Sequence, residues 1–389
     1  MRSELVLLAA LAGLASCQAT TSDAVVVPHA GEPTSGAAPR AARRAAPADA
    51  APEFALGASQ ACARIGGRVH CGPLSQSRPL SAWPPLKGIE DAVDLALADS
   101  FGCVVTARGG VLCFGDNYAG QLGAGVVAVP NDEAVPVVGV AGARRVFVGP
   151  YHACAIVEDG RVDCWGNNSS GQTGGEAEYL SDAVELNWPV RVAGVEGVTE
   201  LALGRESTCA LDAQGRVSCW GAPLTPGPGK APERPGKAAK RGGSNEYQAI
   251  SASSNGVFCG LRQGEVSCWG RVEELTFGRD APAHEKPLPT AGLGRVRRLR
   301  LGLGYGCALH DRGEIVCWGQ ELPGEAPAAE GVDPFEPHAV AGLPPAIDVV
   351  MSQNAACAVS AGHEVYCWGD GLGEGPKGPE ARPVKVLVR

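Results

Sequence analysis

The amino-acid sequence predicts an all-β fold built from seven copies of one repeated unit. The chain has 389 residues, which is long for one ordinary core. Fourteen of its fifteen cysteines form pairs nine or ten residues apart, and the pairs recur about every fifty residues. Such a period is typical of a propeller or a solenoid. Before six of the seven pairs, apolar residues alternate in the same register, and a period of two indicates a strand.

Residues 1–16 have the pattern of a bacterial lipoprotein signal peptide. Arg2 precedes an apolar segment, and Leu14-Ala15-Ser16-Cys17 resembles the lipobox, whose cysteine is acylated and becomes the new N-terminus. Cys17 is also the one cysteine outside the seven pairs, so a lipid such as palmitate accounts for it. The alternative is a plain secreted protein, whose signal peptide would end at a small-residue cleavage site. Gln18 is not the aspartate linked to inner-membrane retention in some bacteria, which favours the outer membrane or cell surface.

Residues 17–53 form a segment rich in Ala, Pro, Thr and Ser, with almost no large apolar residue after Val27. Such a segment cannot bury enough surface to offset its conformational entropy. We therefore expect a lipidated, flexible linker that precedes a folded domain spanning residues 54–389.

The charge and hydropathy of the chain exclude two classes of protein. The formal net charge is −9, whereas a nucleic-acid binder needs a basic surface to displace counterions from phosphates. No apolar run is long enough to span a bilayer as a helix of the mature protein. We expect a monomer that reaches the membrane only through its lipid anchor.

The two cysteines of each pair flank a hairpin turn. If Cys154 and Cys164 lie opposite each other, the loop is Glu158-Asp159-Gly160. Its third residue is glycine, as a type I turn with a bulge requires. The two pairs that are nine residues apart leave the two-residue loops Gly66-Gly67 and Gln263-Gly264, which short hairpins prefer. The seventh unit departs from this rule, because its loop Ala361-Gly362-His363 has glycine in the middle.

The paired cysteines are therefore expected to be cross-strand neighbours, close enough for a disulfide. An exported chain makes oxidation the default, and buried free thiols are the alternative. No C-x2-C spacing occurs and the histidines share no common position, so we expect no metal and no cofactor. The predicted disulfides are Cys62–Cys71, Cys103–Cys113, Cys154–Cys164, Cys209–Cys219, Cys259–Cys268, Cys307–Cys317 and Cys357–Cys367.

The motifs within the repeat resemble those of the regulator of chromosome condensation repeat. They are G-x-x-H-x-C-A-[I/L/V], G-x-V-x-C-W-G and N-x-x-G-Q-L-G, as in "GPYHACAIVEDGRVDCWGNNSSGQTGG" from Gly149 and "CFGDNYAGQLGAG" from Cys113. The resemblance implies a seven-bladed β-propeller over residues 54–389. It also implies that one aromatic residue per unit packs blade against blade, namely Trp165, Trp220, Trp269, Trp318 and Trp368, with Phe114 in unit two.

The ends of the repeat array raise the question of ring closure. The chain ends in "RPVKVLVR", which matches the Pro-Val strands between earlier units, whereas unit one begins at Phe54 without such a strand. We therefore expect residues 383–389 to pair into the first blade, because both termini would otherwise leave open sheet edges. The fourth unit replaces the N-x-x-G-Q-L-G motif with a Pro/Lys-rich insertion, and its outer strand is in doubt.

The sequence favours a binding protein over an enzyme. It has no H-E-x-x-H and no G-x-S-x-G, so no catalytic residue is assigned. The alternative is a hydrolase or lyase with its site at the central channel of the propeller. The resemblance also implies guanine-nucleotide exchange, which some family members perform, but an acidic, exported chain fits that activity least.

The turns before the first cysteine of each unit are the predicted binding face. Every unit runs the same way, so these turns must emerge on one face of a propeller. Their residues vary from unit to unit, and varied aromatic and polar residues on a rigid scaffold suit recognition of a protein or glycan without turnover. The alternative docking site is the insertion at residues 223–245. The predicted face comprises Phe101, Tyr151, His152, Glu206, Asn255, Tyr305 and Asn354.

Overall fold

The structure is a computed structural model, and its described residues all belong to one compact unit, Arg43–Arg389. The predicted signal peptide, the linker up to residue 52 and most of the insertion at residues 223–245 lie outside the described residues. The described residues are 53–58, 60–74, 79–126, 131–174, 185–222, 239–240, 246–270, 284–289, 293–319, 337–369 and 383–386.

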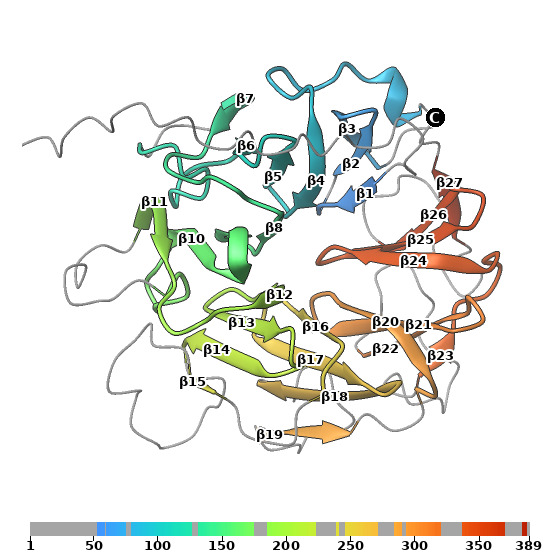
Figure 1. Cartoon of the computed structure of the whole chain (residues 1–389). Coiled ribbons are helices and arrows are strands. Elements are labelled where there is room, and N and C mark those ends of the chain that lie inside the picture. Colours follow the sequence, from blue (N-terminus) through green and yellow to red (C-terminus); the bar gives the residue numbers. More distant parts are fainter. Residues whose placement is uncertain are drawn as a thin grey trace, which may run out of the picture. The chain divides into compact units, whose positions relative to one another are not determined.

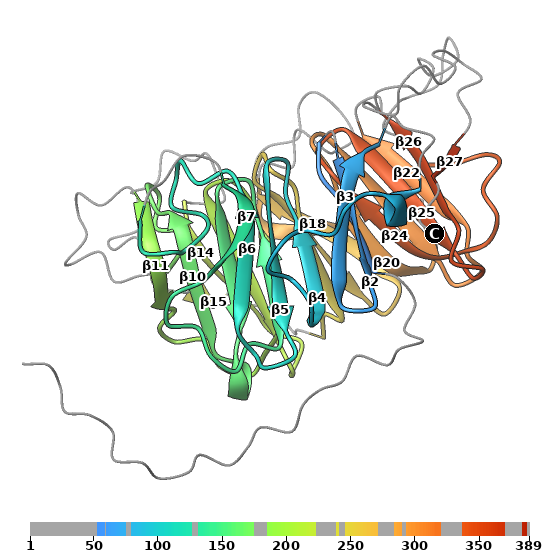
Figure 2. The ribbon, with the colours of Figure 1, turned by 90° about the horizontal axis from the view of Figure 1, so that it is seen from above.

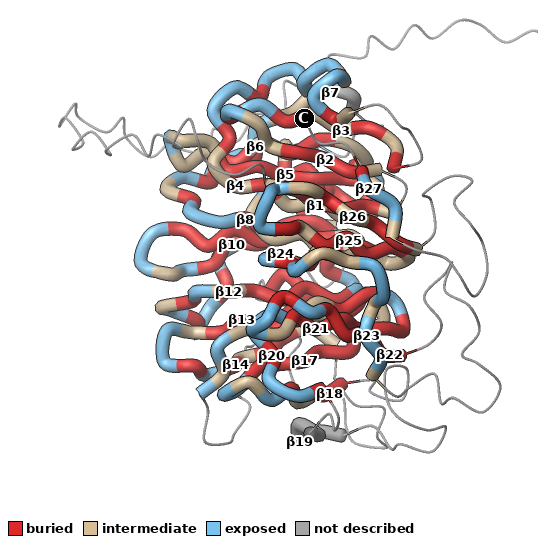
Figure 3. The backbone as a smooth tube through the Cα atoms, turned by 90° about the vertical axis from the view of Figure 1, so that its right-hand side faces the viewer, coloured by how far each residue is buried: buried red, intermediate tan, exposed pale blue. Residues whose placement is uncertain are grey.

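Seven antiparallel sheets surround a central channel, so the predicted seven-bladed β-propeller is confirmed (Figure 1). In every blade the first strand lines the channel, and the next strands follow outward in chain order. Among the residues that the structure describes, the first blade has three strands and the other six have four. Figure 3 shows that the buried residues run along the strands, whereas many turn residues are exposed.

The strands of the first four blades are, in order, β1 (Glu53–Leu56), β2 (Gln60–Ile65) and β3 (Arg68–Pro73); β4 (Ala92–Leu97), β5 (Phe101–Thr106), β6 (Val111–Gly115) and β7 (Asn131–Pro136); β8 (Arg145–Val148), β9 (His152–Ile156), β10 (Val162–Asn167) and β11 (Glu185–Arg191); β12 (Val198–Leu203), β13 (Ser207–Asp212), β14 (Val217–Gly221) and β15 (Ala239–Lys240). The remaining blades comprise β16 (Ala249–Ala252), β17 (Val257–Arg262), β18 (Glu265–Gly270) and β19 (His284–Pro289); β20 (Val296–Leu301), β21 (Tyr305–His310), β22 (Ile315–Gly319) and β23 (His338–Ala339); β24 (Ala346–Met351), β25 (Ala355–Ser360), β26 (Val365–Gly369) and β27 (Val384–Val386). Two short 3-10 turns are η1 (Leu80–Ala82) and η2 (Glu158–Gly160).

All seven predicted disulfides are present, each between the second and third strands of a blade. Cys154 lies directly opposite Cys164, with Cα atoms 4.0 Å apart. The predicted loop is also confirmed, because the Val157 amide donates to the Arg161 carbonyl at 2.9 Å. The spacing of the cysteines therefore determines both the covalent link and the register of the hairpin.

The third residue of each three-residue hairpin loop is left-handed, whether or not it is glycine. The two-residue loops close between Ile65 and Arg68 and between Arg262 and Glu265, as expected. In the seventh unit the third loop residue, His363, takes the left-handed conformation with φ 61°. Gly362, in the middle of that loop, does not adopt this conformation, so the seventh loop keeps the left-handed third position without a glycine there.

The repeat tryptophans pack between blades, as the resemblance implied. Trp165 of β10 is fully buried in a cluster that includes Phe101 and Leu122 of the second blade. Its Nε1 donates to the Gln121 carbonyl at 2.8 Å. Trp220 repeats this contact one blade later, with the Gln172 carbonyl at 2.8 Å. The glutamine of N-x-x-G-Q therefore accepts from the tryptophan of the following blade.

The expected closure by the C-terminal strand is wrong in its detail. β27 pairs with β26, so it is the outer strand of the seventh blade and does not enter the first (Figure 2). The physical reason is that each Pro-Val strand follows its own hairpin and completes the same blade. The ring closes instead by side-chain packing, in which Phe54 and Leu56 of β1 share a cluster with Ala355 and Val365 of the seventh blade.

In the described part of the chain, the outer edge of the first blade is covered without a fourth strand. A segment around η1 follows β3, and the Leu86 amide donates to the Val69 carbonyl at 2.8 Å. His70 Nδ1 lies 2.7 Å from the Trp83 carbonyl oxygen. The fourth blade has a short outer strand, β15, which pairs at Ser218 and Cys219 of β14. Within the described residues, no helix is long and apolar enough to cross a membrane.

Candidate functional site

The turns that join the first and second strands of the blades gather on one face. Here a cavity of about 260 Å³ opens between the turns of the third to seventh blades. Tyr151, Glu206 and Asn255 of the predicted binding face line it. Asn354 is partly buried and follows Gln353, which also lines the cavity. We name this surface the turn face.

Three of the predicted binding residues are not on that surface, and the prediction is wrong for them. Phe101 and His152 are 0% exposed and Tyr305 is 1% exposed. Each begins the second strand of its blade, where its side chain points into the adjoining blades. The Tyr305 hydroxyl donates to the Ser352 carbonyl at 3.1 Å, and His152 Nε2 lies 2.8 Å from Thr208 Oγ1. These residues hold blades together.

Burial keeps His152 neutral, because it lowers the pKa of the imidazole to about 3. Thr208 Oγ1 donates to the Gln172 carbonyl at 2.9 Å, so it accepts from the Nε2–H of His152. The chain His152–Thr208–Gln172 links the third and fourth blades. His152, the histidine of the G-x-x-H-x-C-A motif, is therefore a structural residue.

The turn face has an aromatic and cationic cluster that the sequence alone did not indicate. The Tyr118 ring lies 6.0 Å from the Tyr151 ring in an edge-to-face arrangement, and the side chain of Tyr118 remains 53% exposed. The Arg205 guanidinium lies 5.3 Å from the centre of the Tyr151 ring, a cation–π distance. Tyr118 occupies a variable position of the N-x-x-G-Q-L-G motif in the second blade, so the motif placed it over the third blade without indicating its role.

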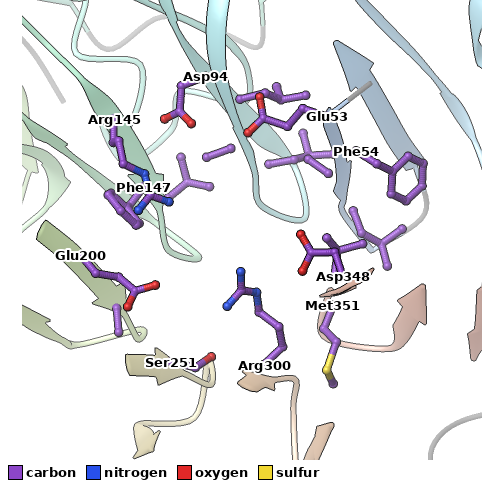
Figure 4. A pocket seen from close by; sticks show the side chains of 18 of the residues that line it. Glu53, Phe54, Asp94, Arg145, Phe147, Glu200, Ser251, Arg300, Asp348 and Met351 are labelled. Atoms are coloured by element: carbon purple, nitrogen blue, oxygen red, sulfur yellow. The ribbon is translucent and has the colours of Figure 1, made fainter. Parts of the chain in front are cut away.

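The other candidate site is the central channel, which encloses a cavity of about 470 Å³ (Figure 4). In six blades the first strand has a charged residue at the same position. This position pairs with the residue of the second strand that lies two places after the blade's first cysteine. In the fifth blade Ala249 occupies it. In the sequence, each of these charged residues directly precedes the first apolar residue of the alternation in its unit. The charged residues are Glu53, Asp94, Arg145, Glu200, Arg298 and Asp348.

Several of these channel charges connect neighbouring blades. Asp94 Oδ2 accepts from the Val146 amide at 2.7 Å, and Glu200 Oε2 accepts from the Ile250 amide at 3.0 Å. Each acceptor therefore binds the backbone of the next blade. Arg298 Nε lies 3.5 Å from Asp348 Oδ1, which links the sixth blade to the seventh.

Glu53 and Asp94 form a carboxyl pair on one wall of the channel. Burial, followed by the charge of Asp94, raises the pKa of Glu53 to about 7, although Arg64 Nε donates to Glu53 Oε2 at 2.9 Å and opposes the shift. Burial also raises the pKa of Asp94. Two like charges in a partly desolvated site disfavour double ionisation, so the pair retains a proton towards neutral pH.

Glu53→Gln is expected to remove a pH dependence of stability. The pKa of Glu53 is about 7 in the folded chain and about 4.5 without these contacts. This contribution to stability is full below about pH 4.5 and is lost as the pH rises through 7. The difference in free energy of unfolding between the variant and the wild type should therefore shift by roughly 1 kcal/mol in favour of the variant from pH 5 to pH 8. The shift is this small because the carboxyl is partly exposed to solvent. Urea unfolding at pH 5 and pH 8 measures this change in the free energy of unfolding. The control is Glu158→Gln, which replaces an exposed carboxyl. An equal change with pH in both variants would contradict the prediction.

These observations define the chain as a seven-bladed β-propeller of disulfide-bridged repeats with one turn face and one charged channel. The repeat is identified by comparison. The profile of the regulator of chromosome condensation (RCC1) repeat matches residues 143–172, which confirms the resemblance seen in unit three.

Known proteins share the repeat and the fold. The RCC1 domain-containing protein RUG3, mitochondrial, from Arabidopsis thaliana is 23% identical over 288 residues, covering 68% of this chain and 62% of the plant protein. The chain thus spans less than two thirds of that relative. Human WBSCR16 matches with a TM-score of 0.65 at 21% identity, over 78% of this chain and 84% of that one. Prp20p of Saccharomyces cerevisiae matches with a TM-score of 0.58 at 16% identity, over 77% of this chain and 79% of that one. At these identities the solved structures show the fold alone.

Proposed function

We propose that this protein is a non-catalytic binding scaffold whose turn face holds a protein or glycan partner outside the cytoplasm. The observation that carries the proposal is the cluster of Tyr118, Tyr151 and Arg205 beside the 260 Å³ cavity. Tyr and Arg are the residue types enriched at interface positions that contribute most of the binding energy. Prp20p, whose structure was described together with its binding to Gsp1p and histones, is a propeller that binds proteins.

The rigidity of the cluster supports this function. Leu122 donates its amide to Asn117 Oδ1 at 3.0 Å, and Asn117 Nδ2 donates to the Val126 carbonyl at 2.8 Å. These contacts fix the loop that carries Tyr118. A surface whose side chains are already held in place loses little conformational entropy on binding.

The paired cysteines support a location outside the cytoplasm. Seven disulfides are typical of proteins in an oxidising environment. Together with the lipobox-like residues 14–17, they support an acylated Cys17 that anchors the protein to a bacterial membrane. Cys17→Ser should move the protein from the membrane to the soluble fraction and abolish labelling with palmitate; a variant that stays in the membrane and is labelled would disprove the anchor.

The turn face is tested with the full chain once a partner has been captured. Tyr151→Ala combined with Arg205→Ala should weaken binding by more than about 2 kcal/mol, or roughly thirtyfold. The matched control is Trp188→Ala, which removes an exposed aromatic side chain from β11. Unchanged affinity in the double variant, with loss of binding on deletion of residues 223–238, which leaves β15 in place, would place the partner on the insertion instead.

A further inference from the structure

The first strands present two layers of side chains to the channel, and the second layer differs from the first. The first layer consists of the six charged residues described above and Ala249 of the fifth blade. Two residues further along each first strand, six blades have an uncharged side chain, and only the sixth blade has a charged one, Arg300. The uncharged members are Ala55, Ala96, Phe147, Ala202, Ser251 and Val350. The repeat itself therefore does not require a cation at this level of the channel.

Arg300 is a channel arginine whose charge no carboxylate among the described residues pairs with. Its Nη1 donates to the Leu299 carbonyl at 2.9 Å, and among the described residues no carboxylate forms an ion pair with it. Figure 4 shows its guanidinium in the open centre of the cavity, with Glu200 to one side and Asp348 to the other. Asp348 is already paired with Arg298, and Glu200 already accepts from the Ile250 amide.

The channel around Arg300 is open, and small apolar side chains form part of its wall. The alanines of the second layer leave space in the channel, and the Phe147 ring lies under the Arg145 guanidinium at 4.6 Å. A cavity of about 470 Å³ is large enough for a small organic molecule. A ligand here would meet a planar cation beside an apolar wall.

We propose that the channel binds a small organic carboxylate, whose carboxylate pairs with Arg300 and whose carbon chain packs against the small apolar residues of the second layer. A guanidinium presents a fork of N–H donors that matches the two oxygens of a carboxylate. The apolar layer favours a carbon chain over an inorganic anion. The site is distinct from the turn face and does not rest on the function proposed for it.

The opposite wall tolerates an anion because its own charge is reduced. Glu53 is paired with Arg64, and the carboxyl pair that it forms with Asp94 retains a proton towards neutral pH. Arg145 adds a second cation next to Phe147. The channel is therefore less negative than its four carboxyl groups suggest.

Hexanoate is a suitable probe, titrated into the full chain at pH 6.5 and followed by saturation-transfer NMR. We expect a Kd of about 1 mM or tighter for hexanoate, and at least tenfold weaker binding of hexanamide, which has the same chain without the charge. Arg300→Gln should also weaken hexanoate binding at least tenfold. The matched control is Arg297→Gln, which removes an exposed arginine from the same strand outside the channel lining.

A second variant guards against misfolding of the first. Ala96→Leu keeps Arg300 but fills the second layer, and it should exclude hexanoate while leaving the melting temperature within a few degrees of the wild type. Failure of the wild type to bind hexanoate below 10 mM, or equal binding by Arg300→Gln and Arg297→Gln, would overturn the proposal. Phosphate binding as tight as that of hexanoate would overturn the assignment of an organic carboxylate.

Discussion

Trp165→Ala is expected to lower the free energy of unfolding by about 3–5 kcal/mol. The side chain is 0% exposed and fills the space between the second and third blades, where it contacts a cluster that includes Leu122 and Val146. Removing it leaves a cavity that the stiff blades cannot close, and it also leaves the Gln121 carbonyl without its donor. Urea unfolding followed by circular dichroism measures the loss.

Two further variants separate the causes of that loss. Trp165→Phe retains most of the buried area but not the hydrogen bond, so its cost should be about 1–2 kcal/mol. Trp188→Ala removes a side chain that is 49% exposed and should change stability by less than about 0.5 kcal/mol. If Trp165→Ala were no more destabilising than Trp188→Ala, the blade-to-blade role of the repeat tryptophans would be refuted.

The fold could be predicted from the sequence because several local signals agree with one another. The cysteine spacing, the position of the left-handed loop residue and the alternation of the first strand all specify the same hairpin. Even the exception, His363, retains the backbone conformation of the third loop position. Where the information was not local, prediction failed: the Pro-Val pattern of β27 indicates a strand but not which neighbour it pairs with.

The candidate sites were harder to predict because they depend on which way a side chain points. Tyr151 and His152 are consecutive, yet one lines the turn face and the other is buried between blades. The aromatic residues of the turns were all interpreted as exposed, although Phe101 and Tyr305 begin strands whose residues are largely buried. The charges of the channel were visible in the sequence, but only the register shows that they face one another.

Reduction of all seven disulfides is expected to prevent the propeller from folding. Each disulfide closes a hairpin and should contribute about 2–3 kcal/mol on the chain-entropy model, and less where the hairpin persists in the unfolded chain. Even half of that value, summed over seven bridges, is of the order of 10 kcal/mol, which matches the total stability of a typical domain. The described blades also bury apolar residues against one another, but two of their outer strands, β15 and β23, are only two residues long.

The experiment must reduce the chain while it is unfolded, because the sulfurs are protected in the folded state. Thirteen of the fourteen paired cysteines are buried, and only Cys71 is partly exposed. A chain reduced in urea and diluted with reductant should show the circular dichroism of an unfolded protein, whereas an oxidised sample taken through the same cycle should refold. In the folded protein, mild reductant should open Cys62–Cys71 first, as mass spectrometry of alkylated peptides would detect. A reduced chain that regained the spectrum and melting temperature of the oxidised one would show that packing alone holds the blades together.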